Sequence, residues 1–113
     1  MKKIGIIGAM EVEVASLKSA MQVSRMLQKA QMEFLEGELE GCQVVVVRSG
    51  IGKVNAAVCT QILVDEFGVD GVINTGIAGS LKAEINIGDI VLSTDVLHHD
   101  MDATGFGYKP GQI

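Results

Sequence analysis

The sequence has little aromatic character and no excess of basic charge. Its 113 residues include no tryptophan, one tyrosine and three phenylalanines. It therefore offers no platform of rings on which nucleic acid bases could stack. Acidic residues outnumber basic ones by 14 to 9, and the formal net charge of −5 disfavours binding to a phosphate backbone. We expect no nucleic acid partner.

Long apolar runs are missing as well. No uninterrupted run exceeds the four residues of Val44–Val47, whereas a membrane-spanning helix needs about 20 apolar residues. The basic pair Lys2-Lys3 is followed by only a short apolar stretch before Glu11, which is a poor match to a secretory signal. These features predict a cytoplasmic protein without a membrane partner.

Cysteine is scarce, and no metal-binding motif is present in the sequence. Cys42 and Cys59 lie in apolar segments and belong to no CxxC or Cys/His cluster. We expect both to be reduced residues of the core. The ionisable stretch His98–Asp102 places neighbouring side chains on opposite sides of an extended chain, which favours a surface role over a metal site.

Glycine is abundant where proline is rare. The chain has 14 glycines and one proline, so that glycine makes up about 12% of the residues against a usual value of about 7%. The glycines lie at the ends of apolar runs, which is typical of turns between strands and helices. Apolar and β-branched runs predict strands, and amphipathic or Ala-rich runs predict helices. We expect strands at Lys3–Gly8, Met32–Leu39, Cys42–Arg48, Gly71–Thr75 and Ile90–Leu97, and helices at 10–21 and Lys53–Phe67.

This order of elements is typical of an α/β fold with a largely parallel sheet. Met32–Leu39 and Cys42–Arg48 are expected to form a hairpin. The helix Lys53–Phe67 has a broad apolar face, so we expect it to be well buried, with Gly68 ending it. No helix follows Ile90–Leu97 to cover it, which suggests the first part of a larger fold.

Three of the expected strands end in turns of small residues, at Gly8-Ala9, Ser49–Gly52 and Thr75–Gly79. In open α/β sheets, ligands bind beyond the carboxyl ends of the strands. The segment around Gly52 lacks the Ser or Thr of a P-loop, and Asn55 replaces the third glycine of a dinucleotide fingerprint. We therefore expect a small-molecule ligand and no nucleotide cofactor.

Two acidic residues begin the first expected helix. Glu11 and Glu13 are two positions apart and so point to different sides, which allows at most one of them to face the ligand. A carboxylate there can act as a general base toward water. Both residues also suit the positive end of the helix dipole, and the sequence leaves these two interpretations open.

Phe106 and Tyr108 are two residues apart in a glycine-rich stretch. If the stretch is extended, both rings point the same way. They then form a contact surface for a ligand or a second subunit, or they fold back onto the chain's own core.

Five segments, in order and spacing, resemble the bacterial 5′-methylthioadenosine/S-adenosylhomocysteine nucleosidases. They are GIIGAMEVE (5–13), SGIGKVNAA (49–57), INTGIAGS (73–80), IGDIV (87–91) and HDMDATGFGY (99–108). The resemblance implies the N-terminal part of a three-layer, nucleoside phosphorylase-like α/β fold with a mixed, largely parallel central sheet. Residues 1–113 would form a single, C-terminally incomplete domain of a homodimer.

The resemblance also implies an activity and its residues. The family hydrolyses the N-glycosidic bond of methylthioadenosine, S-adenosylhomocysteine and 5′-deoxyadenosine, and we expect no cofactor or metal. Glu13 matches the glutamate that activates the attacking water. Ile77 stands where many members have serine. The substrate-binding positions are Ala9, Met10, Ile51, Ile77, Ala78 and Gly79, and the partner subunit would contribute Ala103, Phe106 and Tyr108.

The family's later half carries the aspartate that protonates adenine, a Met-Glu pair on the ribose and an aromatic residue on the base. Residues 1–113 match none of these, so we expect this chain by itself to be inactive. A purine nucleoside phosphorylase is disfavoured because Asn74 stands where phosphorylases often have arginine. A related nucleosidase acting on adenosine or futalosine and a non-catalytic, truncated nucleoside-binding domain are further alternatives.

Overall fold

The computed structural model describes residues 2–112, whose contacts form two compact units, one ending at Gly79 and one beginning at Ser80. The described residues contain five strands, two α-helices and a short 3-10 helix at Thr104–Phe106. The strands and α-helices are β1 (Lys3–Gly8), α1 (Glu11–Ala20), β2 (Gln22–Lys29), β3 (Met32–Leu39), β4 (Cys42–Arg48), α2 (Lys53–Phe67) and β5 (Gly71–Asn74). All of them belong to the first unit.

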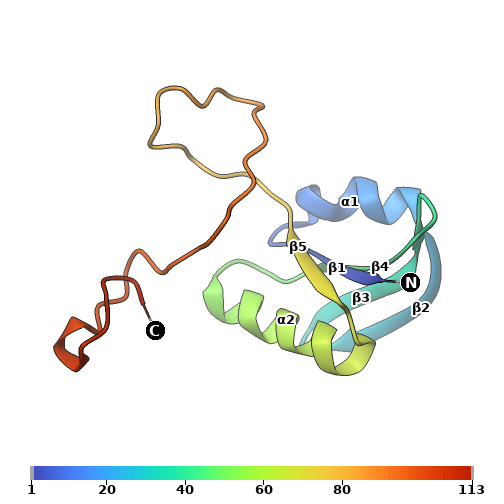
Figure 1. Ribbon diagram of the computed structural model, residues 1–113. Helices are drawn as coiled ribbons and strands as arrows, with labels where there is room; N and C mark the ends of the chain where they lie inside the picture. Colours follow the sequence, from blue (N-terminus) through green and yellow to red (C-terminus); the bar gives the residue numbers. More distant parts are fainter. Residues whose placement is uncertain (1, 113) are drawn as a thin grey trace. The chain divides into compact units, whose positions relative to one another are not determined.

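The strands form one mixed sheet in the order β2-β3-β4-β1-β5 (Figure 1). β1 pairs in parallel with both β4 and β5, whereas β3 pairs antiparallel with β2 and β4. The mixed α/β fold is thus confirmed, and so is the hairpin of β3 and β4. Its turn places Glu40 and Gly41 at positive φ angles of 50° and 79°, a conformation that glycine adopts without steric penalty.

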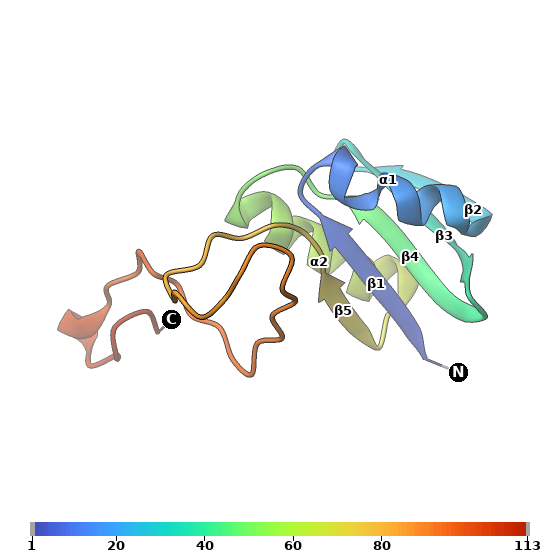
Figure 2. The ribbon, with the colours of Figure 1, turned by 90° about the horizontal axis from the view of Figure 1, so that it is seen from above.

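The alternation of the four valines in β4 explains the three layers. Val45 and Val47 belong to a buried cluster with Leu63 of α2. Val44 and Val46 belong to a second cluster, with Val14 of α1. Because successive side chains of a strand point to opposite faces, this run requires cover on both sides. The two helices supply it, one on each face of the sheet (Figures 1 and 2).

Strand β2 has no counterpart among the strands expected from the sequence. It pairs antiparallel with β3 along its length, with a bulge between Val23 and Arg25. Seven of its eight residues are exposed, so burial does not alternate along it. Its pairing partner defines this strand, since no hydrophobic pattern marks it.

Two other expectations were wrong. Ile90–Leu97, which lies within the described residues, forms no strand; it finds no pairing partner in the second unit, and β-propensity has effect only beside a neighbouring strand. Cys42 is exposed because it opens β4 at the sheet's end, whereas Cys59 is buried as expected and burial raises its pKa to about 11. Both cysteines are free.

The broad apolar face of α2 is only partly buried. Cys59, Leu63 and Phe67 are buried at four-residue spacing, whereas Val54 and Val64 are exposed. The helix crosses the sheet along one narrow stripe, so the rest of its apolar surface has no cover in this unit. Among the described residues, no helix has the length and apolar character needed to cross a bilayer.

Substitution of Gly37 tests the pairing of β2 with β3. A Cβ atom at this position would lie 2.0 Å from the carbonyl oxygen of Gln22 and 3.0 Å from the Cα of Val23. These are backbone atoms, which cannot move aside cheaply. We expect Gly37→Ala to lower the free energy of unfolding by about 1–3 kcal/mol, measured by urea denaturation.

The matched control is Gly71→Ala on β5. Its Cβ would meet the Ile4 Cδ1 atom at 3.6 Å, an ordinary contact, so its effect is expected to stay near 0.5 kcal/mol. Equal effects of the two substitutions would contradict the close β2–β3 approach.

Candidate active site

The three turns of small residues meet at one edge of the sheet. β1, β4 and β5 run parallel, so their carboxyl ends lie together. The amide of Ser49 donates to the carbonyl of Gly8 at 2.9 Å, and the amide of Thr75 donates to that of Ile7 at 2.9 Å. The expected ligand-binding edge is thus assembled from segments almost 70 residues apart in the sequence.

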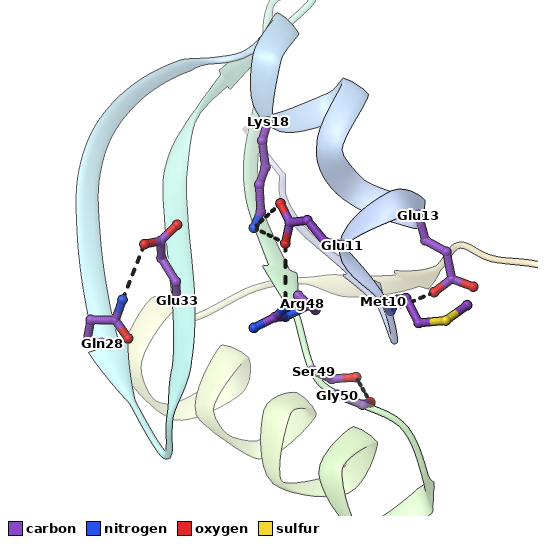
Figure 3. Close-up of polar contacts among 9 residues, drawn as sticks. All are labelled: Met10, Glu11, Glu13, Lys18, Gln28, Glu33, Arg48, Ser49 and Gly50. Atoms are coloured by element: carbon purple, nitrogen blue, oxygen red, sulfur yellow. Dashed lines mark hydrogen bonds and ion pairs between the residues drawn. The ribbon is translucent and has the colours of Figure 1, made fainter.

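Glu13 connects two of these strand ends. It lies in the first turn of α1, and its carboxylate accepts a hydrogen bond from the Met10 amide at 3.0 Å, as drawn in Figure 3. It also accepts one from the Ile77 amide, at 3.4 Å, in the turn after β5. The carboxylate is therefore fixed between the exits of β1 and β5.

Gly76 permits this position of Glu13. A Cβ atom on Gly76 would lie 2.6 Å from the Glu13 Oε1 atom and 3.0 Å from its Cδ. The residue has no positive φ. Glycine is therefore needed here to make space for the carboxylate, since the backbone conformation at this position is open to other residues.

The amides around Glu13 favour its charged form. The N–H of Met10 lowers the pKa of Glu13 most; partial burial opposes this, and the N–H groups of Ile77 and Ala9 lower the pKa further. Hydrogen bonds donated to a carboxylate stabilise its ionised state. At neutral pH, Glu13 is a carboxylate held in place and able to accept a proton.

A cavity of about 500 Å³ opens between the ends of β1 and β4, and its wall includes Met10, whose amide donates to the Glu13 carboxylate. Ala9, Met10 and Ile51, three of the expected substrate-binding residues, are in its wall. Ala78 and Gly79 lie elsewhere, as exposed residues of the turn that follows Ile77 after β5.

Glu11 faces away from Glu13, as their spacing predicts. Its carboxylate oxygens lie 3.1 Å from the Nζ of Lys18, and one of them lies 4.0 Å from the Nε of Arg48 (Figure 3). Glu11 and Arg48 both line the cavity. Arg48 was not among the residues proposed from the sequence, although its position at the carboxyl end of a buried strand was a usable signal.

The second unit contains the three residues expected from a partner subunit. Ala103 begins the 3-10 turn, and its carbonyl accepts the amides of Phe106 at 2.9 Å and Tyr108 at 3.4 Å. The stretch is therefore a tight turn, so the condition for parallel rings does not hold. The Phe106 side chain is 87% exposed, so it does not fold back onto a core of its own unit.

Asp102 stabilises the same turn. Its Oδ1 atom accepts hydrogen bonds from the Thr104 hydroxyl at 2.6 Å and from the Thr104 amide at 3.0 Å. The hydroxyl, followed by the amide, lowers the pKa of Asp102. The surface role expected for His98–Asp102 is consistent with this structural use of the carboxylate.

Comparisons with known proteins agree on one family. A family model described as the phosphorylase superfamily matches residues 3–113. A 5′-methylthioadenosine/S-adenosylhomocysteine nucleosidase of Shewanella piezotolerans is 51% identical over 111 residues, which cover 98% of this chain and 48% of the relative. One from Bacillus velezensis is 50% identical over the same shares. The chain spans about half the length of these curated relatives.

Solved structures give the same result. The crystal structure of a nucleosidase of this name from Colwellia psychrerythraea, in complex with adenine, superposes with a TM-score of 0.94 at 52% identity, covering 99% of this chain and 46% of that one. A futalosine hydrolase of Helicobacter pylori superposes with a TM-score of 0.87 at 31% identity, covering 99% of this chain and 48% of that one.

The hydrogen bonds around Glu13 predict the pH range in which its carboxylate takes up a proton, and the effect of a substitution on that range. The hydrogen bonds to the carboxylate are fully present above the ordinary glutamate pKa of about 4.3, and they are lost as the pH falls through the lower pKa of the folded protein. Carboxyl-detected NMR is expected to give a Glu13 midpoint below the ordinary value. Gly76→Ala displaces the carboxylate and is expected to move the midpoint upward.

The same substitution is expected to leave the fold intact, because the displaced atoms are the far end of a flexible side chain. Circular dichroism melting of Gly76→Ala checks this. An unchanged Glu13 midpoint in a folded Gly76→Ala protein would contradict the placement of the carboxylate.

Proposed function

The chain belongs to the phosphorylase superfamily, and from this membership we propose that it supplies the water-activating half of a nucleosidase for 5′-thioadenosines. The reaction is hydrolysis of the N-glycosidic bond of 5′-methylthioadenosine and S-adenosylhomocysteine, the substrates in the relatives' names. One observation carries the proposal: the Glu13 carboxylate is held ionised by the amides of Met10 and Ile77 at the ligand-binding edge.

In the proposed mechanism, Glu13 takes a proton from a water molecule whose oxygen attacks C1′ of the ribose. The bond from C1′ to N9 of adenine breaks, its electron pair goes to the base, and the base takes up a proton from the aspartate that the family resemblance places outside residues 1–113. The proton on Glu13 is later lost to solvent. The ribosyl group acquires positive charge in the transition state. A fixed anionic carboxylate stabilises that charge as well as accepting the proton, and both roles require its ionised form.

The remaining residues are proposed to position the substrate. Ala9, Met10 and Ile51 line the cavity between the ends of β1 and β4, and we assign them to the ribose and the 5′-thio group. Ala78 and Gly79 are assigned to adenine, whose edge can bond to backbone groups of a turn made of small residues. Ile77 acts through its amide, which bonds to Glu13, so the absence of a serine hydroxyl leaves that contact intact.

Water is favoured over phosphate as the nucleophile. An anionic carboxylate at the attack position repels phosphate, while it orients and deprotonates water. Futalosine is the second candidate substrate because a futalosine hydrolase shares the fold at 31% identity over nearly the whole chain. The adenine-release assay described below distinguishes hydrolysis from phosphorolysis and methylthioadenosine from futalosine.

A second copy of the chain is part of the proposal. Ala103, Phe106 and Tyr108 would cover the 5′-thio group of the neighbouring subunit in a homodimer. The 87% exposure of the Phe106 side chain supports a contact outside its own unit. A cytoplasmic location belongs to the same proposal.

The test uses a chimaera in which residues 1–113 replace the matching part of the Colwellia enzyme. We expect it to release adenine from methylthioadenosine at a rate independent of inorganic phosphate. Glu13→Gln removes the base while keeping the size of the side chain, and is expected to lower the rate by about 10²–10⁴-fold. Released adenine is measured by liquid chromatography.

The matched control is Glu11→Gln, which makes the same change two residues away on the opposite side of α1 and is expected to keep most of the rate for methylthioadenosine. A phosphate requirement would replace hydrolysis by phosphorolysis. A marked preference for futalosine would change the substrate. A Glu13→Gln chimaera as active as the parent would refute the role of the carboxylate.

A further inference from the structure

We propose that Arg48 and Glu11 form a subsite for the amino-acid end of S-adenosylhomocysteine. This inference rests on the proposed function and adds the residues that distinguish its two substrates. Methylthioadenosine and S-adenosylhomocysteine differ only in the group on the 5′ sulfur. One carries a methyl group, and the other carries a chain that ends in a carboxylate and an ammonium group on the same carbon.

A single cavity joins the two regions that this subsite requires. One part of its wall consists of Met10 and Ile51, assigned above to the ribose and the 5′-thio group. Another part carries the charged side chains of Glu11 and Arg48. The volume of about 500 Å³ leaves room for a thioether chain beside the ribose. A substituent on the sulfur therefore reaches charged groups without leaving the cavity.

Glu11 and Arg48 of the cavity wall form, together with the neighbouring Lys18, a cluster of two cations and one anion. Both carboxylate oxygens of Glu11 lie 3.1 Å from the Nζ of Lys18, whose side chain is only 14% exposed. Arg48 makes a long ion pair with the same carboxylate, at 4.0 Å, and its side chain is 55% exposed. The two bonds from Lys18 occupy about half of the roughly four acceptor sites of a carboxylate, so Glu11 can accept a further donor, and the half-exposed guanidinium of Arg48 can meet another anion. Figure 3 shows the three side chains.

An α-amino acid fits this arrangement. Its carboxylate and ammonium groups are one carbon apart, so they require a cation and an anion close together. Arg48 and Glu11 meet this requirement, with 4.0 Å between the Nε and Oε2 atoms. The planar guanidinium binds a carboxylate through two parallel hydrogen bonds, and Glu11 accepts the ammonium.

The wall of the cavity between these groups is fixed by its own hydrogen bonds. The Ser49 hydroxyl donates to the carbonyl of Gly50 at 2.8 Å, and the side-chain amide Nδ2 of Asn55 donates to the carbonyl of Ile51 at 2.7 Å. The loop from β4 to α2 is thereby held in shape with its polar side chains already engaged. Arg48 and Glu11, the charged residues of the cavity wall, are then left to recognise the substrate's charged end.

The test measures dissociation constants by NMR titration of the chimaera described above with three thioethers, in its Glu13→Gln form so that the ligands are hydrolysed only slowly. They are methylthioadenosine, S-adenosylhomocysteine and 5′-(3-aminopropylthio)-5′-deoxyadenosine, which has the same chain without the carboxylate. Arg48→Gln is expected to raise the dissociation constant of S-adenosylhomocysteine about 10-fold, the usual effect of losing a charge-assisted pair. The other two ligands are expected to bind no more weakly than before. Arg48→Lys, which keeps the charge, is expected to fall in between.

Arg25→Gln is the matched control, because it removes the same charge at a residue on β2 that stacks on Phe67, 5.0 Å from the ring centroid, and is absent from the cavity wall. Equal weakening of all three ligands in Arg48→Gln, or no weakening at all, overturns the subsite. If methylthioadenosine binds the chimaera with Arg48 intact and only the Arg48 effect is missing, the proposed function stands without the subsite. If neither natural thioether binds, the proposed function fails and the subsite fails with it.

Discussion

The parallel hydrogen bonding of β1 with β4 on one side and β5 on the other is the constraint on which the molecule depends. Parallel strands leave the sheet at the same edge, so three separate turns of small residues come together. The valines of β4, covered by α1 on one face and α2 on the other, hold this arrangement in place. The candidate site is thus a product of the core beneath it.

The two glutamates of α1 illustrate how one helix serves two purposes. Their two-residue spacing separates them by roughly 200° around the helix axis. Glu13 turns toward Gly76 and Ile77, where backbone amides stabilise its charge. Glu11 turns toward Lys18 and Arg48, where side-chain cations do so. One carboxylate suits chemistry at the ribose, and the other suits recognition of a charged substituent.

Two glycines allow other groups to come close to the backbone, each for a different reason. Gly37 lets β2 lie against β3, where backbone meets backbone, whereas Gly76 lets a side chain reach the turn after β5. The first glycine serves stability and the second serves the position of a functional group. The distinction follows from what each added Cβ would strike: immovable backbone in one case and a flexible carboxylate in the other.

The sequence by itself determined the elements with a strong local pattern: the valine strand β4, the hairpin with β3, the two helices and the three turns of small residues. It also determined that Glu11 and Glu13 diverge, because helical geometry is local. The tertiary structure decided what depends on distant partners. Strand β2 exists because β3 pairs with it, and Ile90–Leu97 forms no strand because no neighbouring strand pairs with it. Cys42 is exposed because it is the first residue of β4. Only the fold could bring Glu13 to Ile77, 64 residues away, since hydrophobic periodicity reports which side of an element is buried and carries no information about which residues meet there.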